Sequence, residues 1–152
     1  MPLWQIFHPV GTFDNKDAKQ ALAEDITKMY TELDLPAFYV VAQFIPLPVQ
    51  DIWIGGDTRA SKPFIRVVIN HVALNMPDED AVYKHATSRI DTVLKPHISD
   101  KDYDWEYHVG ETDRRLWKIN GMIPPPYRSE EEQEWVKENR AIPYDGAYWK
   151  PL

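Results

Sequence analysis

Position 2 of the chain is the first place where a residue type and its setting suggest chemistry. Pro2 precedes residues 3–7 (LWQIF), whose composition is typical of a strand. Removal of the initiator Met1 before a small residue would expose the secondary amine of Pro2. Burial and nearby cations favour the neutral form of such an amine, which can then accept a proton. We therefore expect Pro2 to be a general base. The alternative is a chance Met-Pro start, since proline supplies about 5% of residues.

Arginines and a histidine are candidate partners for this base. Arg114 and Arg115 could hold a carboxylate through the guanidinium fork, and their charge would favour a neutral amine. The alternative for both is an ion pair with nearby acidic residues such as those in 130–134. Arg66 lies in mid-strand among apolar residues, so its charged end must reach solvent, a carboxylate or an interface. His71 ends that strand, where α/β sheets tend to bind ligands, and histidine titrates near neutrality.

The composition argues against several other classes of function. The net charge of −7 disfavours nucleic-acid binding, which requires a basic surface. Without cysteine, disulfides, thiolate metal sites and cysteine nucleophiles are excluded. The five histidines have no metal-binding spacing, and we expect neither a metal nor a cofactor. No apolar run approaches about 18 residues and no leader is recognisable, so we expect no membrane contact and a cytoplasmic location.

The elements that must position these residues occur in two similar halves. Residues 1–62 predict a strand at 2–7, a helix capped by Asp14 or Asn15, and a strand at 38–45 whose apolar composition indicates cover on both faces. Residues 63–110 repeat this order with a strand at 64–69, a helix that begins near Asn75 and Pro77, and a strand at 103–109. Residues 52–54 are expected to form a short edge strand between the halves.

Each half is a βαβ unit, in which the strands are parallel and the crossover is right-handed. We therefore predict an α+β fold in a single domain, with a four-stranded mixed sheet and two helices on one face. The extension at 111–152 predicts a short turn, an extended proline run and a helix at 130–140. Its aromatic residues indicate packing against the sheet or a neighbouring subunit. Trp117 and Asn120 are candidate pocket walls, although a tryptophan more often belongs to the core.

The Met-Pro start, the tandem βαβ units and the tail with its Asn120-Gly121 pair and proline run resemble the tautomerase superfamily. The segment 114–121 (RRLWKING) is most similar to the branch of cis-3-chloroacrylic acid dehalogenase, especially its fungal relatives. The resemblance covers nearly the whole chain. It implies a homotrimer in which an N-terminal proline acts as base or acid on a 2-oxo (enol) or unsaturated carboxylic acid. Arginines would bind the substrate carboxylate, and no cofactor takes part.

The dehalogenase residues carry over to this chain only in part. The catalytic proline matches Pro2, and a histidine late in the first helix falls on Tyr30. One carboxylate-binding arginine falls near His71, and a tyrosine of the last strand falls near His108. These four positions are therefore the catalytic candidates that the resemblance implies.

Two other positions have lost the family's chemistry. The second carboxylate-binding arginine falls near Leu74, and the water-activating glutamate falls near Ile119, so dehalogenation or hydration is poorly supported. The favoured prediction is an isomerase of the tautomerase type, with Arg114 or Arg115 on the carboxylate. One alternative is a non-catalytic trimer that serves as a binding or regulatory module. Another is an unrelated ferredoxin-like dimer whose aromatic sheet face binds an apolar ligand.

Overall fold

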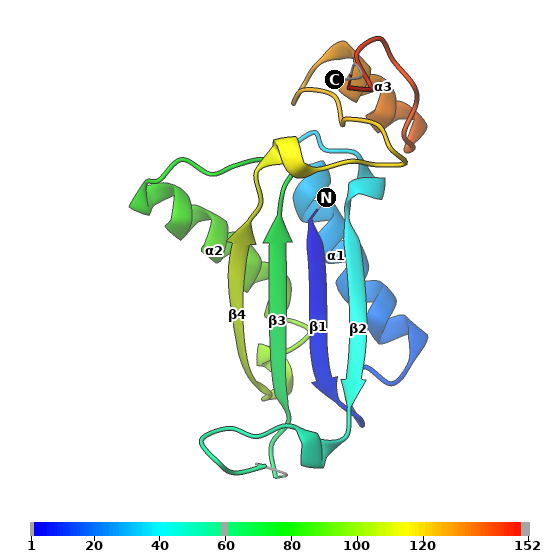
Figure 1. Cartoon of the computed structure of the whole chain (residues 1–152). Helices are drawn as coiled ribbons and strands as arrows, with labels where there is room; N and C mark the ends of the chain where they lie inside the picture. Colours follow the sequence, from blue (N-terminus) through cyan, green and yellow to red (C-terminus); the bar gives the residue numbers. More distant parts are fainter. Residues whose placement is uncertain (1, 59–60, 150–152) are drawn as a thin grey trace.

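The computed structural model describes residues 2–58 and 61–149, and its centre is one four-stranded sheet of order β2-β1-β3-β4. The strands are β1 (Leu3–Pro9), β2 (Val41–Leu47), β3 (Phe64–His71) and β4 (Asp104–Glu111) (Figure 1). β1 is parallel to β2, β3 is parallel to β4, and β1 and β3 pair antiparallel. The predicted α+β fold, two βαβ units merged in one mixed sheet, is confirmed. Met1, whose removal the sequence predicts, lies outside the described residues.

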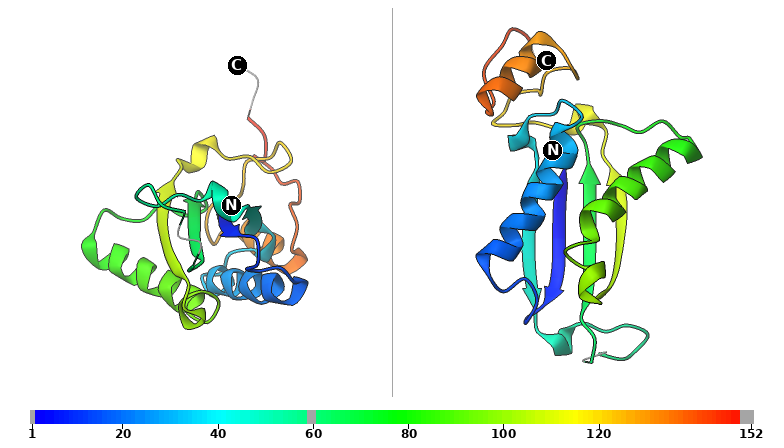
Figure 2. Two further views of the ribbon diagram at one scale, coloured as in Figure 1. Left: turned by 90° about the horizontal axis from the view of Figure 1, so that it is seen from below. Right: turned by 180° about the vertical axis from the view of Figure 1, so that it is seen from behind.

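Helices α1 (Lys16–Thr31) and α2 (Asp80–Leu94) cover the same face of the sheet (Figure 2). Asn15 is the N-cap of α1, and its side chain accepts a hydrogen bond from the backbone of Ala18 at 2.8 Å. The predicted start of α2 near Asn75 and Pro77 is wrong, because the helix begins at Asp80. The backbone N–H of Met76 instead donates to the carboxylate of Glu111 at 2.8 Å, which ties this segment to the end of β4.

The core lies between the sheet and these two helices. Alternate residues of β1 (Trp4 and Ile6) and of β3 (Ile65, Val67 and Ile69) point into it and are fully buried. Their neighbours along the strands face the other side of the sheet, which no described helix covers, as the two views in Figure 2 show. That second face is where partly exposed apolar side chains of the sheet gather.

Two sequence-based expectations for the strands need correction. Residues 37–39 form a 3-10 helix, so the second strand starts at Val41, and its residues are only partly buried because β2 is an edge strand with one uncovered face. Residues 52–54 do not form an edge strand. Ile54 makes a single bridge with Asp57, because Gly55 and Gly56 adopt positive φ and close a tight turn directly after it.

The extension leaves the end of β4, crosses this edge of the sheet and folds beyond the beginnings of β1 and β2 (Figure 1). Its helix α3 (Glu130–Glu138) buries Trp135, whose ring lies 6.2 Å from that of Tyr39. The hydroxyl of Tyr127 donates to the carbonyl of Leu33 at 2.8 Å. The extension thus packs on the segment between α1 and β2. Tyr148 and Trp149 stay exposed at 57% and 64%.

The described residues contain neither a membrane-spanning helix nor a cluster of metal ligands. No helix within 2–58 or 61–149 is long and apolar enough to cross a membrane. Within the same ranges, no cluster of three or more His, Asp or Glu side chains has the arrangement needed to hold a metal ion.

Candidate active site

The register of the sheet brings the beginning of β1 next to the end of β3. Leu3 pairs with Asn70, so the next position of the antiparallel register joins Pro2 and His71. Pro2 is buried, and its carbonyl accepts a hydrogen bond from the N–H of Val41 at 2.9 Å. A cavity of about 200 Å³ opens at this point between α1, α2 and the loop after β3, and both Pro2 and His71 line it. Two residues that the sequence singled out therefore share one cavity.

Tyr30, from the last turn of α1, lines the same cavity and is hydrogen-bonded to His71. Its hydroxyl lies 2.6 Å from Nε2 of His71 and accepts a hydrogen bond from Nε1 of Trp4 at 2.9 Å. An indole N–H only donates, so the Tyr30 oxygen is an acceptor toward Trp4 and its hydroxyl proton is free to point to Nε2 of His71 in the tautomer that carries the ring proton on Nδ1. We assign the ring proton of His71 to Nδ1 on this basis, since this tautomer lets Tyr30 donate to Nε2.

Burial controls the protonation of both groups. It lowers the pKa of His71, although the nearby Glu111 carboxylate acts in the opposite direction, so the imidazole is neutral at neutral pH. Burial also raises the pKa of Tyr30, although the Trp4 hydrogen bond and the Arg89 charge oppose this, and the phenol keeps its proton. The site therefore holds an uncharged, hydrogen-bonded pair of Tyr30 and His71 beside the buried Pro2.

A cation of this cavity was missed in the sequence. Arg89 of α2 lines the cavity together with His85, which lies one turn earlier on the same helix face. The guanidinium Nη2 donates to the carbonyl of Met29 at 2.7 Å and to the carboxylate of Glu32 at 3.0 Å. The available signal was the i, i+4 spacing of His85 and Arg89 beside the apolar stripe of the helix.

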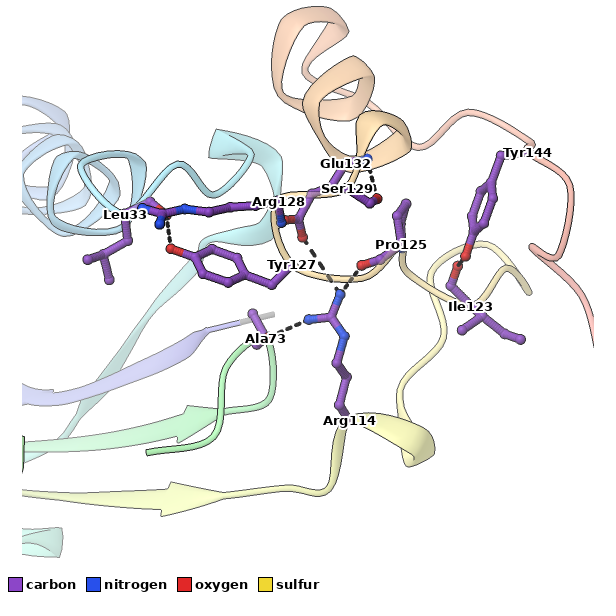
Figure 3. Close-up of polar contacts among 10 residues, drawn as sticks. All are labelled: Leu33, Ala73, Arg114, Ile123, Pro125, Tyr127, Arg128, Ser129, Glu132 and Tyr144. Carbon is purple, nitrogen blue, oxygen red and sulfur yellow. Dashed lines mark hydrogen bonds and ion pairs between the residues drawn. The ribbon is translucent and has the colours of Figure 1, made fainter. Parts of the chain in front are cut away.

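Arg114 lies nearby but is engaged in holding the extension to the sheet (Figure 3). Its guanidinium donates to the carbonyl oxygens of Ala73 and Pro125 and lies 3.6 Å from the fully buried carboxylate of Glu132. It also stacks over the ring of Trp117 at 5.3 Å. We call this arrangement of Arg114, Ala73, Pro125, Glu132 and Trp117 the Arg114 clamp. Since Ala73 lines the cavity, Arg114 supports the cavity wall without itself lining it.

The other candidates from the extension also lie outside the cavity lining. Arg115 is 82% exposed and pairs with Asp113, its Nε 3.0 Å from the carboxylate. Trp117 is buried against Tyr39 as part of the core. Asn120 is an exposed residue at positive φ, followed by Gly121 at positive φ, in a tight two-residue turn. Within the chain, the RRLWKING segment thus makes structural contacts and does not line the cavity.

Arg66 and His108 lie on the uncovered face of the sheet. Arg66 forms an ion pair with Glu106, and its Nη2 lies 3.4 Å from Nδ1 of His108. Both belong to strand positions that alternate with the core-facing ones, so they point away from the side where α1 and α2 pack. Within the chain, the structure does not bring them to Pro2.

Comparisons with known proteins identify the relatives of this fold. Residues 1–140 match the family described as "Putative oxalocrotonate tautomerase enzyme". The crystal structure of native RhCC from Rhodococcus jostii RHA1 shares 37% identity, with a TM-score of 0.86, over 93% of this chain and 99% of that one. A "probable enzyme" from the thermophilic fungus Aspergillus fumigatus shares 42% identity, with a TM-score of 0.86, over 95% and 98%.

More distant structures share the fold alone. A wild-type fused 4-OT, described as an "asymmetric trimer", has a TM-score of 0.61 at 17% identity, over 80% of this chain and 94% of that one. No curated protein shows a match. The family match over most of the chain and the relatives at 37% and 42% identity agree with the sheet topology, and the chain therefore belongs to the tautomerase superfamily.

Proposed function

We propose that the protein is a tautomerase in which Pro2, exposed as the amino terminus after loss of Met1, is the general base. The substrate is a small 2-oxo acid, its enol, or an unsaturated carboxylic acid. Pro2 removes a proton from the carbon next to the carbonyl, and the electron pair moves to form the enolate. Because Tyr30 occupies Nε2 of His71, the Nδ1–H of His71 is the donor for the enolate oxygen.

The observation that carries this proposal is the shared cavity of Pro2, Tyr30 and His71. Burial disfavours the charged form of an amine, and the Arg89 guanidinium in the same lining acts in the same direction. A base must be neutral to accept a proton at neutral pH. Loss of a well-positioned base reduces the rate by about 10² to 10⁴.

Membership of the cis-3-chloroacrylic acid dehalogenase branch, in its fungal form, is also a proposal. The 42% identity to the Aspergillus fumigatus protein supports the fungal relation. Activity as a dehalogenase or hydratase is less well supported, because Ile119 stands near the expected glutamate. Ile119 forms a bridge with Met122 across the Asn120-Gly121 turn, and an aliphatic side chain cannot activate water.

A non-catalytic binding or regulatory role is the second candidate. It is favoured by the arginines that the sequence singled out, since Arg66, Arg114 and Arg115 are all engaged in protein contacts within the subunit. Under this alternative the cavity would bind a ligand without converting it, and Pro2→Ala would exchange protons at the same rate as the wild type.

The homotrimer and the cytoplasmic location remain part of the same proposal. Partly exposed apolar residues of the uncovered sheet face, such as Phe7, Ile45 and Val68, support burial against other copies. The expected product of such an assembly is a closed ring of three subunits. Sedimentation at several concentrations distinguishes a trimer from the dimer of an unrelated ferredoxin-like protein.

The test combines intact mass with a proton-exchange assay. We expect the natively expressed protein to lack Met1 and to exchange the proton next to the carbonyl of a 2-oxo acid with solvent. Pro2→Ala keeps a small second residue, so that Met1 is still removed, and leaves a primary amine in place of the proline ring nitrogen. If processed Pro2→Ala retains full activity, or if the native protein retains Met1, Pro2 is not the base.

A further inference from the structure

The lining of the Pro2 cavity limits which carboxylic acids can enter it. Apart from Tyr30, His71, His85 and Arg89, the side chains that line it are apolar. We propose that the substrate is a monocarboxylic 2-oxo acid with an aliphatic substituent, whose carboxylate is bound by Arg89. This assignment rests on the proposed function, and it replaces Arg114 and Arg115 with a cation from α2.

The walls of the cavity come from three elements. Met29 lies near the end of α1, and Leu33 is the second residue after that helix. Leu74 lies in the loop after β3. Val82 and Ile90 belong to α2. A second carboxylate placed against these side chains would lose its hydration without gaining a partner, which is strongly unfavourable. A branched aliphatic group of similar size would instead bury apolar surface. The walls therefore discriminate against dicarboxylic acids.

The guanidinium of Arg89 still has N–H groups that can bind a carboxylate. Its side chain is 23% exposed, and both recorded hydrogen bonds use Nη2. No acceptor among the described residues forms a hydrogen bond with Nε or Nη1, and a guanidinium can donate from both sides of its fork. The bonds to Met29 and Glu32 fix the side chain between α1 and α2, so little conformational freedom is lost on binding a carboxylate.

The reaction balances with the groups of this cavity. Neutral Pro2 takes a proton from C3 of the 2-oxo acid, and the C3–H electron pair forms the C2–C3 double bond. The carbonyl electrons move to the oxygen, which accepts a hydrogen bond from Nδ1–H of His71. Return of a proton or a solvent deuteron from Pro2 to C3 restores the 2-oxo acid. No redox partner is required.

The experiment measures deuterium uptake at C3 by NMR for three compounds. These are 4-methyl-2-oxopentanoate, its neutral methyl ester, and 2-oxopentanedioate, which carries a second carboxylate. Arg89→Gln is compared with Lys84→Gln, an exposed lysine on the same helix that does not line the cavity. Pro2→Ala sets the background rate, and Arg89→Lys serves as the charged variant if Arg89→Gln does not fold.

We expect the branched acid to react with a kcat/KM roughly 100-fold above that of the diacid. Arg89→Gln should raise the KM of the acid by about 10- to 100-fold and change the KM of the ester by less than about 3-fold. Arg89→Lys should stay between the two, and Lys84→Gln should match the wild type. A merely structural role of Arg89 would affect acid and ester alike.

The outcomes separate this inference from the function on which it rests. Equal use of the diacid, or equal effects of the Arg89 variants on acid and ester, would overturn the substrate assignment and leave a Pro2-dependent tautomerase. Exchange that does not exceed the Pro2→Ala background with any of the three compounds would overturn the proposed function itself, and the substrate assignment with it.

Discussion

Replacing Arg114 with methionine tests whether the extension is held by a buried charge. Arg114 is the cation beside Glu132, whose side chain is fully buried, and it is itself 24% exposed. Methionine keeps the length and the contact with the ring of Trp117 but loses the charge and the bonds to Ala73 and Pro125. Removing one partner of a buried pair costs about 3–5 kcal/mol, and the partial exposure of Arg114 favours the lower end, about 3 kcal/mol.

This loss is large enough to measure by urea unfolding. With a slope of about 2 kcal/mol per M, a change of about 3 kcal/mol moves the midpoint by about 1.5 M. The melting temperature should fall by about 6–12 °C for a chain of this size. Fluorescence of Trp117, which belongs to the clamp, and of Trp135, which follows Glu132 in α3, reports the transition. Protein concentration must be held constant, because the proposed trimer would make the apparent stability depend on it.

The partner variant supplies the control. In Glu132→Gln, the amide oxygen can still accept the 2.7 Å hydrogen bond from the N–H of Arg128, while the buried charge is gone. If the cost of Arg114→Met comes from an uncompensated Glu132, then adding Glu132→Gln should recover at least about half of the loss. A single variant within about 0.5 kcal/mol of the wild type, or a double variant with no recovery, would refute the reasoning.

The pH dependence has a definite sign. Burial raises the pKa of Glu132, although the N–H of Arg128 and the charge of Arg114 oppose this. A carboxyl whose folded pKa is raised favours the folded state where it is protonated, and that stability is lost as the pH rises through the folded pKa. The deficit of Arg114→Met should therefore be greatest at about pH 8. It should shrink as the pH falls toward about 4.3, the usual pKa of glutamate.

Three further predictions concern the cavity and the sheet. Tyr30→Phe leaves the buried Nε1 of Trp4 without its acceptor, so urea unfolding should show a loss of about 1–3 kcal/mol and the exchange assay a lower kcat; unchanged stability would contradict the network. Burial lowers the pKa of both His8 and His71, so stability should fall as the pH drops below about 6.5, and His71→Gln should flatten part of that decline in pH-dependent melting. Phe7→Asp, on the uncovered sheet face, should shift the sedimentation of the protein toward the monomer, and an unchanged trimer would remove this face from the interface.

The sheet and the two main helices were predictable because local signals agreed with one another. Alternation in β1 and β3, the Asn15 cap and the apolar spacing of Leu22, Ile26 and Met29 all survive in the structure. The errors occurred where a tertiary contact decides the local conformation. The backbone N–H of Met76 donates to the carboxylate of Glu111, which lies 35 residues later. No local sequence pattern around residue 76 predicts that hydrogen bond.

Three of the predicted candidates, Pro2, Tyr30 and His71, line one cavity. The sequence selects Pro2 by its Met-Pro start and His71 by its place at a strand end, and the resemblance implies Tyr30. The antiparallel pairing of β1 and β3 that brings Pro2 to His71 was not predicted. Arg66 and His108 were predicted as site residues mainly from their residue types. Because side chains alternate along a strand, both lie on the sheet face opposite α1 and α2. The register decides the face, and the register between β1 and β3 is a long-range property that the sequence does not state.

The fold also explains why we propose Arg89, and not Arg114 or Arg115, as the residue that binds the substrate carboxylate. Arg114 and Arg115 are prominent in the sequence because they are adjacent and lie beyond the last strand, where a loop could reach a substrate. Arg114 is instead needed as a counter-charge, since Glu132 is fully buried and an unpaired carboxylate there would destabilise the extension. Arg89 belongs to a helix that packs on α1, so its position is set by the fold, and its bonds to Met29 and Glu32 use Nη2 while the side chain lines the cavity. A cation whose place is fixed by helix packing can bind a substrate, whereas one that neutralises a buried carboxylate cannot leave it without unfolding the segment that it holds.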